Sequence, residues 1–320
     1  MQINPIISAI IPTKNRCITL KRAIESVLMQ SYSNIEIIII NDNSNDETDQ
    51  LISNYLELEN VHYIKNNISI GGLAARMKGV KIAKGEYIAF LDDDDEWLPM
   101  KLEKQLTILK GNNKIGAVSS WFSVNNGNIS YKRKLNTEVN INELMSANVL
   151  GGFSLCMVRK TIANSIAKEI KIINNIPSHQ DWVFWIEVML KSNVYVLPEN
   201  LVIQHSHSGP RISKNYYNNI IGREVLINRY KNHMDSKQLI KHLVGIELLK
   251  MKTNISFRNK LKHYHKAFLS FPFKSTILFI FEIINLFFPR SIFYNKIKWR
   301  VLFLLRQSKF MNKQIDRLIP

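Results

Sequence analysis

Residues 6–11, IISAII, and residues 35–40, IEIIII, are the two stretches that decide the fold. Each is a continuous run of mainly β-branched residues bounded by polar turns, which is typical of a strand buried on both faces of a mainly parallel sheet. Between them, residues Thr19–Met29 carry apolar side chains at helical spacing. The order strand, helix, strand predicts a βαβ unit.

The same alternation continues to about residue 100. The expected elements are a helix after Asp46, a strand at His62–Lys65, a helix near Leu73–Ala83 and a strand at Tyr87–Leu91. This order predicts an open, mainly parallel α/β sheet sandwiched by helices, in a Rossmann-like arrangement. Such sheets bind ligands at the carboxyl ends of their strands, so polar residues at these ends are the first functional candidates.

After residue 100 the alternation becomes less regular, and from Tyr216 onward the pattern is helical. The expected elements in between are a helix to about Lys110, strands at Ala117–Phe122 and Leu155–Val158, a helix at Asp181–Lys191 and a strand at Tyr195–Ile203. We expect this half to hold the second substrate.

Positive charge is concentrated toward the C-terminal end. The formal net charge is +17, and residues 216–320 carry 20 Lys and Arg against 5 Asp and Glu, whereas residues 1–215 carry 23 against 21. Between Phe268 and Leu305 the cations alternate with apolar stretches such as Ser275–Phe288, which is shorter than the roughly 20 residues of a spanning helix. Residues 216–320 are therefore expected to form a helical, basic, amphipathic region on an anionic membrane surface. The alternative is a helical appendage packed on the body with a solvated basic face.

The expected location is cytoplasmic, peripheral on the inner face of the cell membrane. Pro5–Pro12 is a short apolar run with no preceding basic region and no small-residue cleavage site, unlike a signal peptide. Cys17 and Cys156 form no CxxC pair, which fits a reducing compartment and argues against a disulfide framework or a zinc site.

The sequence FLDDDDEWLP, Phe90–Pro99, carries the strongest chemical signal. Four adjacent carboxylates repel one another unless a cation neutralises them. Oxygen ligands select Mg²⁺ or Mn²⁺, which proteins usually hold with one or two carboxylates plus substrate phosphates. The stretch therefore predicts a divalent metal site.

In an extended backbone, alternate side chains point to the same side. Asp92 and Asp94 would then share a metal and a diphosphate. Asp93 and Asp95 would lie on the other side. The alternative is a solvated acidic turn, or a helix N-cap before Trp97.

Three stretches of the sequence match the motifs of a known protein family in order and spacing. They are SAIIPTKNR (Ser8–Arg16), SVLMQSYSNIEIIIINDNSND (Ser26–Asp46) and GGLAARMKGVKIAKGEYIAFLDDDDEWLPMKLEKQ (Gly71–Gln105). They resemble the family 2 glycosyltransferases with the GT-A fold, of the bacterial surface polysaccharide type. The likeness is close over the first third of the chain and looser to about residue 213. It implies a GT-A domain over residues 1–215, with a nucleotide-sugar-binding half at 1–105 and an acceptor half at 106–215.

The resemblance also implies an activity: an inverting, metal-dependent hexosyltransferase that uses Mn²⁺ or Mg²⁺. The donor would be a nucleotide-diphosphate sugar, with UDP as the expected nucleotide. The acceptor would be a hydroxyl of a glycan or lipid-linked oligosaccharide in cell-surface polysaccharide biosynthesis.

By the same resemblance, Pro12, Thr13 and Arg16 line the nucleotide site in the loop after the first strand. Asp42 matches the carboxylate that recognises the base, where a buried acceptor facing an imide N–H discriminates strongly. The alternative role of Asp42 is an Asx turn. Arg76 matches an arginine near the donor phosphates, where its planar fork suits a bidentate contact; otherwise it is a helix-surface arginine.

Within the four aspartates, the resemblance assigns Asp92 and Asp94 to the DxD-type signature. Asp94 would be the direct metal ligand, and Asp93 would lie closer to the sugar or ribose. Two positions depart from the family pattern, because Lys14 replaces the usual aromatic residue and Met77 the usual asparagine. Neither departure removes a group that the chemistry requires.

The segment SHQDWVFWIEVML, Ser178–Leu190, resembles the second acidic motif of the family. It makes Asp181 the candidate general base for the acceptor hydroxyl. The alternative is that Asp181 caps the helix that carries the tryptophans. Further along the chain, two histidines follow a predicted strand, and His207 is the better candidate of the two, before His205, to contact the diphosphate or the metal. The alternative is that both are ordinary surface histidines.

Other functions fit less well. A sugar-phosphate nucleotidyltransferase would share the architecture but needs a glycine-rich phosphate loop where PTKNR stands, and a dinucleotide-dependent oxidoreductase needs GxGxxG there. A non-catalytic membrane-surface or nucleic-acid-binding protein would depend on the basic tail, while the four aspartates would repel a phosphate backbone. The expected partners are the sugar donor, the acceptor and an anionic membrane, and no nucleic acid.

Overall fold

The computed structural model describes residues 4–127, 129–169, 176–206, 215–253, 259, 262–263 and 265. The chain divides into two compact units, Met1–Gln238 and Leu239–Pro320. The first unit holds the sheet and every described residue of the predicted site.

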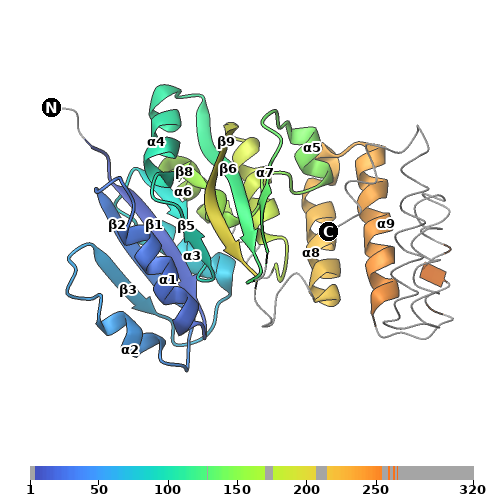
Figure 1. Cartoon of the computed structure of the whole chain (residues 1–320). Helices are drawn as coiled ribbons and strands as arrows, with labels where there is room; N and C mark the ends of the chain where they lie inside the picture. The colour runs from blue at the N-terminus through green and yellow to red at the C-terminus, as the bar shows by residue number, and fades with distance from the viewer. Residues whose placement is uncertain are drawn as a thin grey trace. The chain divides into compact units, whose positions relative to one another are not determined.

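Four parallel strands form one half of the sheet: β1 (Ile7–Thr13), β2 (Ile35–Asn41), β3 (Val61–Lys65) and β4 (Tyr87–Phe90). They lie side by side in the order β3-β2-β1-β4 (Figure 1). Every residue of β1, β2 and β4 is buried, as expected of strands covered on both faces. The predicted βαβ start of the fold is thus confirmed.

The other half of the sheet is mixed. Its strands are β5 (Asp95–Trp97), β6 (Ile115–Asn125), β7 (Ser130–Arg133), β8 (Met157–Arg159) and β9 (Asn193–His205). The full order is β3-β2-β1-β4-β8-β6-β9-β5, with β7 paired to β6. β8 runs antiparallel to β4 and β6, β5 antiparallel to β9, and β7 antiparallel to β6. β6 and β9 pair in parallel. The sheet is therefore mixed but mostly parallel, and the antiparallel pairs come from the short strands β5, β7 and β8.

Helices cover both faces of this sheet (Figure 1). One face packs against α1 (Cys17–Leu28) and α4 (Lys101–Gly111). The other packs against α3 (Gly72–Ile82), α6 (Lys160–Glu169) and α7 (Gln180–Met189). Alternate strand residues enter each core: Ile10 and Ile38 face α3, whereas Ala9 and Ile37 face α1.

The remaining elements are shorter or lie further along the chain. They are α2 (Thr48–Ser53), α5 (Ile141–Ser146), α8 (Tyr216–Tyr230), α9 (Ser236–Lys252) and the 3₁₀ turns η1 (Phe153–Leu155) and η4 (Lys231–His233). Among the described α-helices and strands, β5, β7, α5 and α6 were not predicted. Both cysteines are free.

The structure confirms helices after Tyr216 as far as it describes them, and α8 belongs to the first compact unit. The predicted membrane-binding stretch, Phe268–Leu305, lies outside the described residues. Within the part of the chain that is described, none of the helices combines the length and the apolar character needed to cross a bilayer.

Candidate active site

The four aspartates form a turn at the carboxyl end of β4, not an extended strand. The main-chain N–H of Asp95 donates to the carbonyl oxygen of Asp92 at 3.0 Å, and β5 begins at Asp95. Asp92, Asp94 and Asp95 consequently offer carboxylate oxygens that all lie within 4.8 Å of one another. Asp92 and Asp94 come together as expected, but the expectation that Asp95 lies on the other side was wrong. The turn caps no helix, because α4 begins only at Lys101.

Arginines surround this acidic turn, which we define as Asp92–Asp95. Nη1 of Arg16 lies 3.0 Å from Oδ1 of Asp93 and 2.7 Å from Oδ2 of Asp94. Arg76 forms an ion pair with Asp92. Nη2 of Arg22 donates to the main-chain oxygen of Asp94 at 2.8 Å, a contact with no signal in the sequence.

Asp93 faces the end of β1. Its Oδ2 accepts a hydrogen bond from Oγ1 of Thr13 at 2.8 Å, and Pro12 is buried one residue earlier in the strand. Burial raises the pKa of Asp93 to about 6, and the neighbouring Asp94 adds to the rise, while Arg16 opposes it. The structure thus brings Thr13, Arg16 and Asp93 into contact.

Asp95 is buried beneath the turn, and sequence reasoning gave it no role. Its Oδ2 accepts from Oγ of Ser154 at 2.5 Å and from Nε2 of Gln204 at 3.5 Å. The same Ser154 hydroxyl accepts from the main-chain N–H of Asp92 at 3.0 Å. Burial, followed by the charges of Asp92 and Asp94, raises the pKa of Asp95 well above its usual value.

This donor set fits a hard divalent cation. Three carboxylates within 4.8 Å supply the oxygen ligands that Mg²⁺ and Mn²⁺ prefer. A cation would also relieve the repulsion that raises the pKa of Asp95.

Asp42 anchors the loop that leads into α3. Its Oδ1 accepts from Nδ2 of Asn66 at 2.9 Å and from N of Ile70 at 2.7 Å, and its Oδ2 accepts from Oγ of Ser69 at 2.7 Å and from N of Gly71 at 2.8 Å. Burial alone would raise the pKa of Asp42, but these hydrogen bonds outweigh it and lower the pKa. All four bonds reach residues 66–71, so they form no Asx turn. Base recognition by Asp42 stays a prediction, and it would require one of these bonds to be exchanged.

Arg76 is held where α3 meets α7. Its guanidinium carbon lies 4.2 Å from the centre of the Phe153 ring, and its side chain is only 10% exposed. A Cβ at Gly72 would come within 3.0 Å of Nη1 of Arg76 and 3.5 Å of Oε1 of Gln180. Arg76 is therefore no ordinary helix-surface arginine.

Asp181 lies in the first turn of α7, one residue after Gln180. The N-cap residue is His179, which adopts a left-handed conformation with φ 61°, so Asp181 does not cap the helix. Nδ2 of Asn148 donates to Oδ2 of Asp181 at 3.0 Å. Burial raises the pKa of Asp181 to about 6; the charge of Asp92 adds to the rise and that of Arg76 opposes it. The charges of Asp92 and Arg76 therefore act on the pKa of Asp181 in opposite directions.

Of the two candidate histidines, the structure describes only His205. Nε2 of His205, the last residue of β9, lies 2.9 Å from Oε2 of Glu96. His207, the predicted metal or diphosphate contact, lies outside the described residues.

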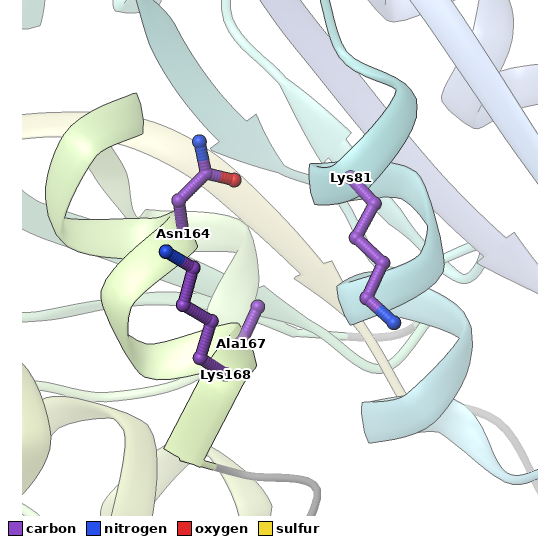
Figure 2. Close-up of a pocket in the computed structure, with 4 residues that line it drawn as sticks. All are labelled: Lys81, Asn164, Ala167 and Lys168. Atoms are coloured by element: carbon purple, nitrogen blue, oxygen red, sulfur yellow. The ribbon is translucent and has the colours of Figure 1, made fainter.

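A cavity of about 400 Å³ lies away from these groups, between α3 and α6 (Figure 2). Lys81, Asn164, Ala167 and Lys168 line it. None of the predicted site residues that the structure describes lines this cavity, so the acidic turn, not the cavity, identifies the site.

A parallel half-sheet that ends in an arginine-bound acidic turn, joined to a mixed half-sheet and covered by helices on both faces, is the architecture of the GT-A type of glycosyltransferase. The chain belongs to glycosyltransferase family 2, because the family model "Glycosyl transferase family 2" matches residues 8–166 and a relative supports the same membership. That relative is an uncharacterized glycosyltransferase of Methanocaldococcus jannaschii, 31% identical over 208 residues, which are 63% of this chain and 70% of the relative.

A second relative has a named reaction. WfgD from Escherichia coli, a UDP-Glc:alpha-D-GlcNAc-diphosphoundecaprenol beta-1,3-glucosyltransferase, is 27% identical over 189 residues, which are 59% of this chain and 72% of WfgD.

Two solved structures share the fold. TarS of S. aureus in complex with UDP-GlcNAc matches with a TM-score of 0.62 at 15% identity, over 85% of this chain and 83% of the other. The mannosyltransferase PcManGT from Pyrobaculum calidifontis, in complex with GDP-Man and Mn²⁺, matches with a TM-score of 0.53 at 13% identity, over 96% and 82%.

Proposed function

We propose that this family 2 glycosyltransferase is an inverting, metal-dependent enzyme that transfers a hexose from a UDP-sugar to a hydroxyl of a lipid-linked oligosaccharide in surface polysaccharide biosynthesis. The observation that carries the proposal is the acidic turn, with Arg16 and Arg76 bound to it and Asp181 within reach of its charge. These are the groups that a sugar diphosphate and an acceptor hydroxyl require.

The donor side of the site comes from the ends of the parallel strands. Arg76 and Arg16 bind the diphosphate, because guanidinium forks match phosphate oxygens. Thr13 and Asp93, joined by a 2.8 Å hydrogen bond, hold the ribose or the sugar. Asp42 shapes the edge of the base site through the loop 66–71.

Asp92, Asp94 and Asp95 would hold Mn²⁺ or Mg²⁺. When bound, such an ion stabilises the negative charge that develops on the departing diphosphate. The Mn²⁺ bound in the PcManGT complex supports this choice of metal.

Asp181 acts as the general base. It takes the proton of the acceptor hydroxyl while the hydroxyl oxygen forms a bond to the anomeric carbon of the sugar. The bond from that carbon to the diphosphate breaks on the opposite side, and its electron pair leaves with the diphosphate. A carboxylate with a pKa of about 6 is ionised at neutral pH and still basic enough to assist.

The choice of substrates follows the relatives. WfgD is named for UDP-Glc and a diphosphoundecaprenol-linked acceptor, and TarS was solved with UDP-GlcNAc. Residues 1–105 would bind the donor and 106–215 the acceptor. The basic residues 216–320 would hold the enzyme on the inner face of the membrane, where a lipid-linked acceptor is found.

A donor panel tests the proposal. The full chain with Mn²⁺ should release nucleoside diphosphate from at least one UDP-sugar when a lipid-diphosphate-linked glycan is present. Asp94→Asn and Asp181→Asn should each stay folded and lose transfer, by about 10²–10⁴-fold for the base. Glu57→Gln, which removes an exposed carboxylate far from the acidic turn in sequence, is the control and should match the wild type. Near-wild-type turnover in Asp94→Asn or Asp181→Asn would remove that residue from the mechanism.

A further inference from the structure

Arg16 occupies an unusual position among the arginines of the site. Its Nη1 atom bridges two carboxylates, 3.0 Å from Asp93 and 2.7 Å from Asp94. The guanidinium is therefore bound as a counter-ion within the acidic turn.

Asp94 also belongs to the three carboxylates that fit a divalent cation. Oδ2 of Asp94 is already engaged by Arg16. A metal ion that uses Asp94 would meet the positive charge of Arg16 on the same carboxylate, and like charges at this range oppose each other. The charge of Arg16 therefore weakens metal binding at Asp94.

Arg16 is also more exposed than Arg76. It is the N-cap residue of α1, in the loop after β1, and its side chain is 34% exposed. Arg76 is 10% exposed and stacked on Phe153. Arg22 donates to the main-chain oxygen of Asp94, and this hydrogen bond leaves the carboxylate of Asp94 out of the contact.

We propose that Arg16 stands in for the metal cation in the nucleotide-free enzyme and moves from Asp94 to the donor diphosphate when metal and donor bind. This inference rests on the proposed donor and metal site. Its consequence is that each ligand strengthens the binding of the other, because the diphosphate removes the competing charge from Asp94 and the metal frees Arg16 for the diphosphate. Such coupling is reciprocal by thermodynamic necessity.

The test measures Mn²⁺ binding to the full chain with and without UDP. Electron paramagnetic resonance detects the Mn²⁺ that stays free in solution. Arg16→Gln should bind Mn²⁺ several-fold more tightly than the wild type when UDP is absent. UDP should tighten Mn²⁺ binding strongly in the wild type and much less in Arg16→Gln. Arg16→Lys keeps the positive charge, so its Mn²⁺ affinity without UDP should stay near that of the wild type.

Lys21→Gln is the matched control. It makes the same change in charge on the same helix, but Lys21 pairs with Glu25 at 3.9 Å and belongs to the exposed surface. It should behave as the wild type with and without UDP, which separates competition at Asp94 from a general change in charge. Arg16→Met, neutral and of similar length, gives the same comparison if Arg16→Gln does not fold.

The outcomes are distinct. If Arg16→Gln binds Mn²⁺ no more tightly than the wild type without UDP, or if UDP tightens binding equally in both, the role of Arg16 is refuted and the metal site stands. If the wild type and Arg16→Gln bind no Mn²⁺ even with UDP, the proposed metal site fails and this inference falls with it.

Discussion

Asp181 takes its properties from the residues around it. Burial and the charge of Asp92 raise its pKa, Arg76 opposes the rise, and Asn148 donates to its Oδ2 at 3.0 Å. Because a general base must be ionised, protonation of Asp181 abolishes its role. We expect kcat/KM for transfer to fall as the pH drops through about 6.

Asp93 also has a pKa of about 6, so the fall in kcat/KM at low pH could come from either carboxyl group. A variant of Asn148, which contacts Asp181, distinguishes the two. The hydrogen bond from Asn148 favours the ionised carboxylate, so Asn148→Ala should move the acid limb to higher pH. The measurement is kcat/KM against pH for both proteins. An acid limb that stays in place would assign it to a group other than Asp181.

Ser154 joins two aspartates of the turn. Its hydroxyl donates to Asp95 and accepts from the main-chain N–H of Asp92. Ser154→Ala leaves a buried carboxyl and an N–H without these partners, so we expect a loss of about 1–3 kcal/mol in the free energy of unfolding, together with weaker Mn²⁺ binding. Urea denaturation and metal titration measure the two effects. Ser53→Ala, at an exposed helix end, is the control; equal effects in both variants would deny Ser154 its role.

Among the elements of the site, α3 begins with a glycine that lies close to the Arg76 guanidinium. Gly71 has φ 86°, and a Cβ at Gly72 would approach Arg76 to 3.0 Å. Gly72→Ala should therefore displace the guanidinium from Asp92 and raise the KM for the donor, on the order of tenfold to a hundredfold. Steady-state kinetics with varied donor measures the change. Gly111→Ala meets no atom within 4 Å and serves as the control, and an unchanged donor KM in Gly72→Ala would show that Arg76 tolerates the shift.

Element prediction from the sequence succeeded where periodicity is strong. The buried runs became β1 and β2, and the apolar side of Thr19–Met29 became the buried face of α1. The turn at Asp92–Asp95 could not be predicted from alternation, because β5 begins at Asp95 by pairing with β9, far along the chain. Ser154 and Gln204 escaped notice for the same reason, since single polar residues carry no periodic signal.

At the scale of the whole molecule, the site combines both halves of the first compact unit. Asp92 and Arg16 follow strands of the parallel half, whereas Asp181 lies in the first turn of a helix of the other half. Family resemblance found most of these residues, because their spacing within motifs is fixed. The contacts that hold them together depend on the folded chain.

The membrane prediction also belongs to this scale. Deleting residues 265–320 should release the protein from vesicles that contain anionic lipid, because the deletion removes basic and apolar residues together. Co-sedimentation with anionic and with neutral vesicles, in low and high salt, measures this. An unchanged bound fraction after the deletion would refute the anchor.

The pairing of Asp95 with Gln204 has a practical consequence for protein engineering. A hybrid enzyme that joins residues 1–105 of this chain to the second half of another transferase would inherit the four aspartates but neither Ser154 nor Gln204. Its metal turn would then depend on whatever the new half places at those two positions. A hybrid that exchanges the acceptor half therefore has to keep Ser154 and Gln204, or equivalent side chains, at these two positions.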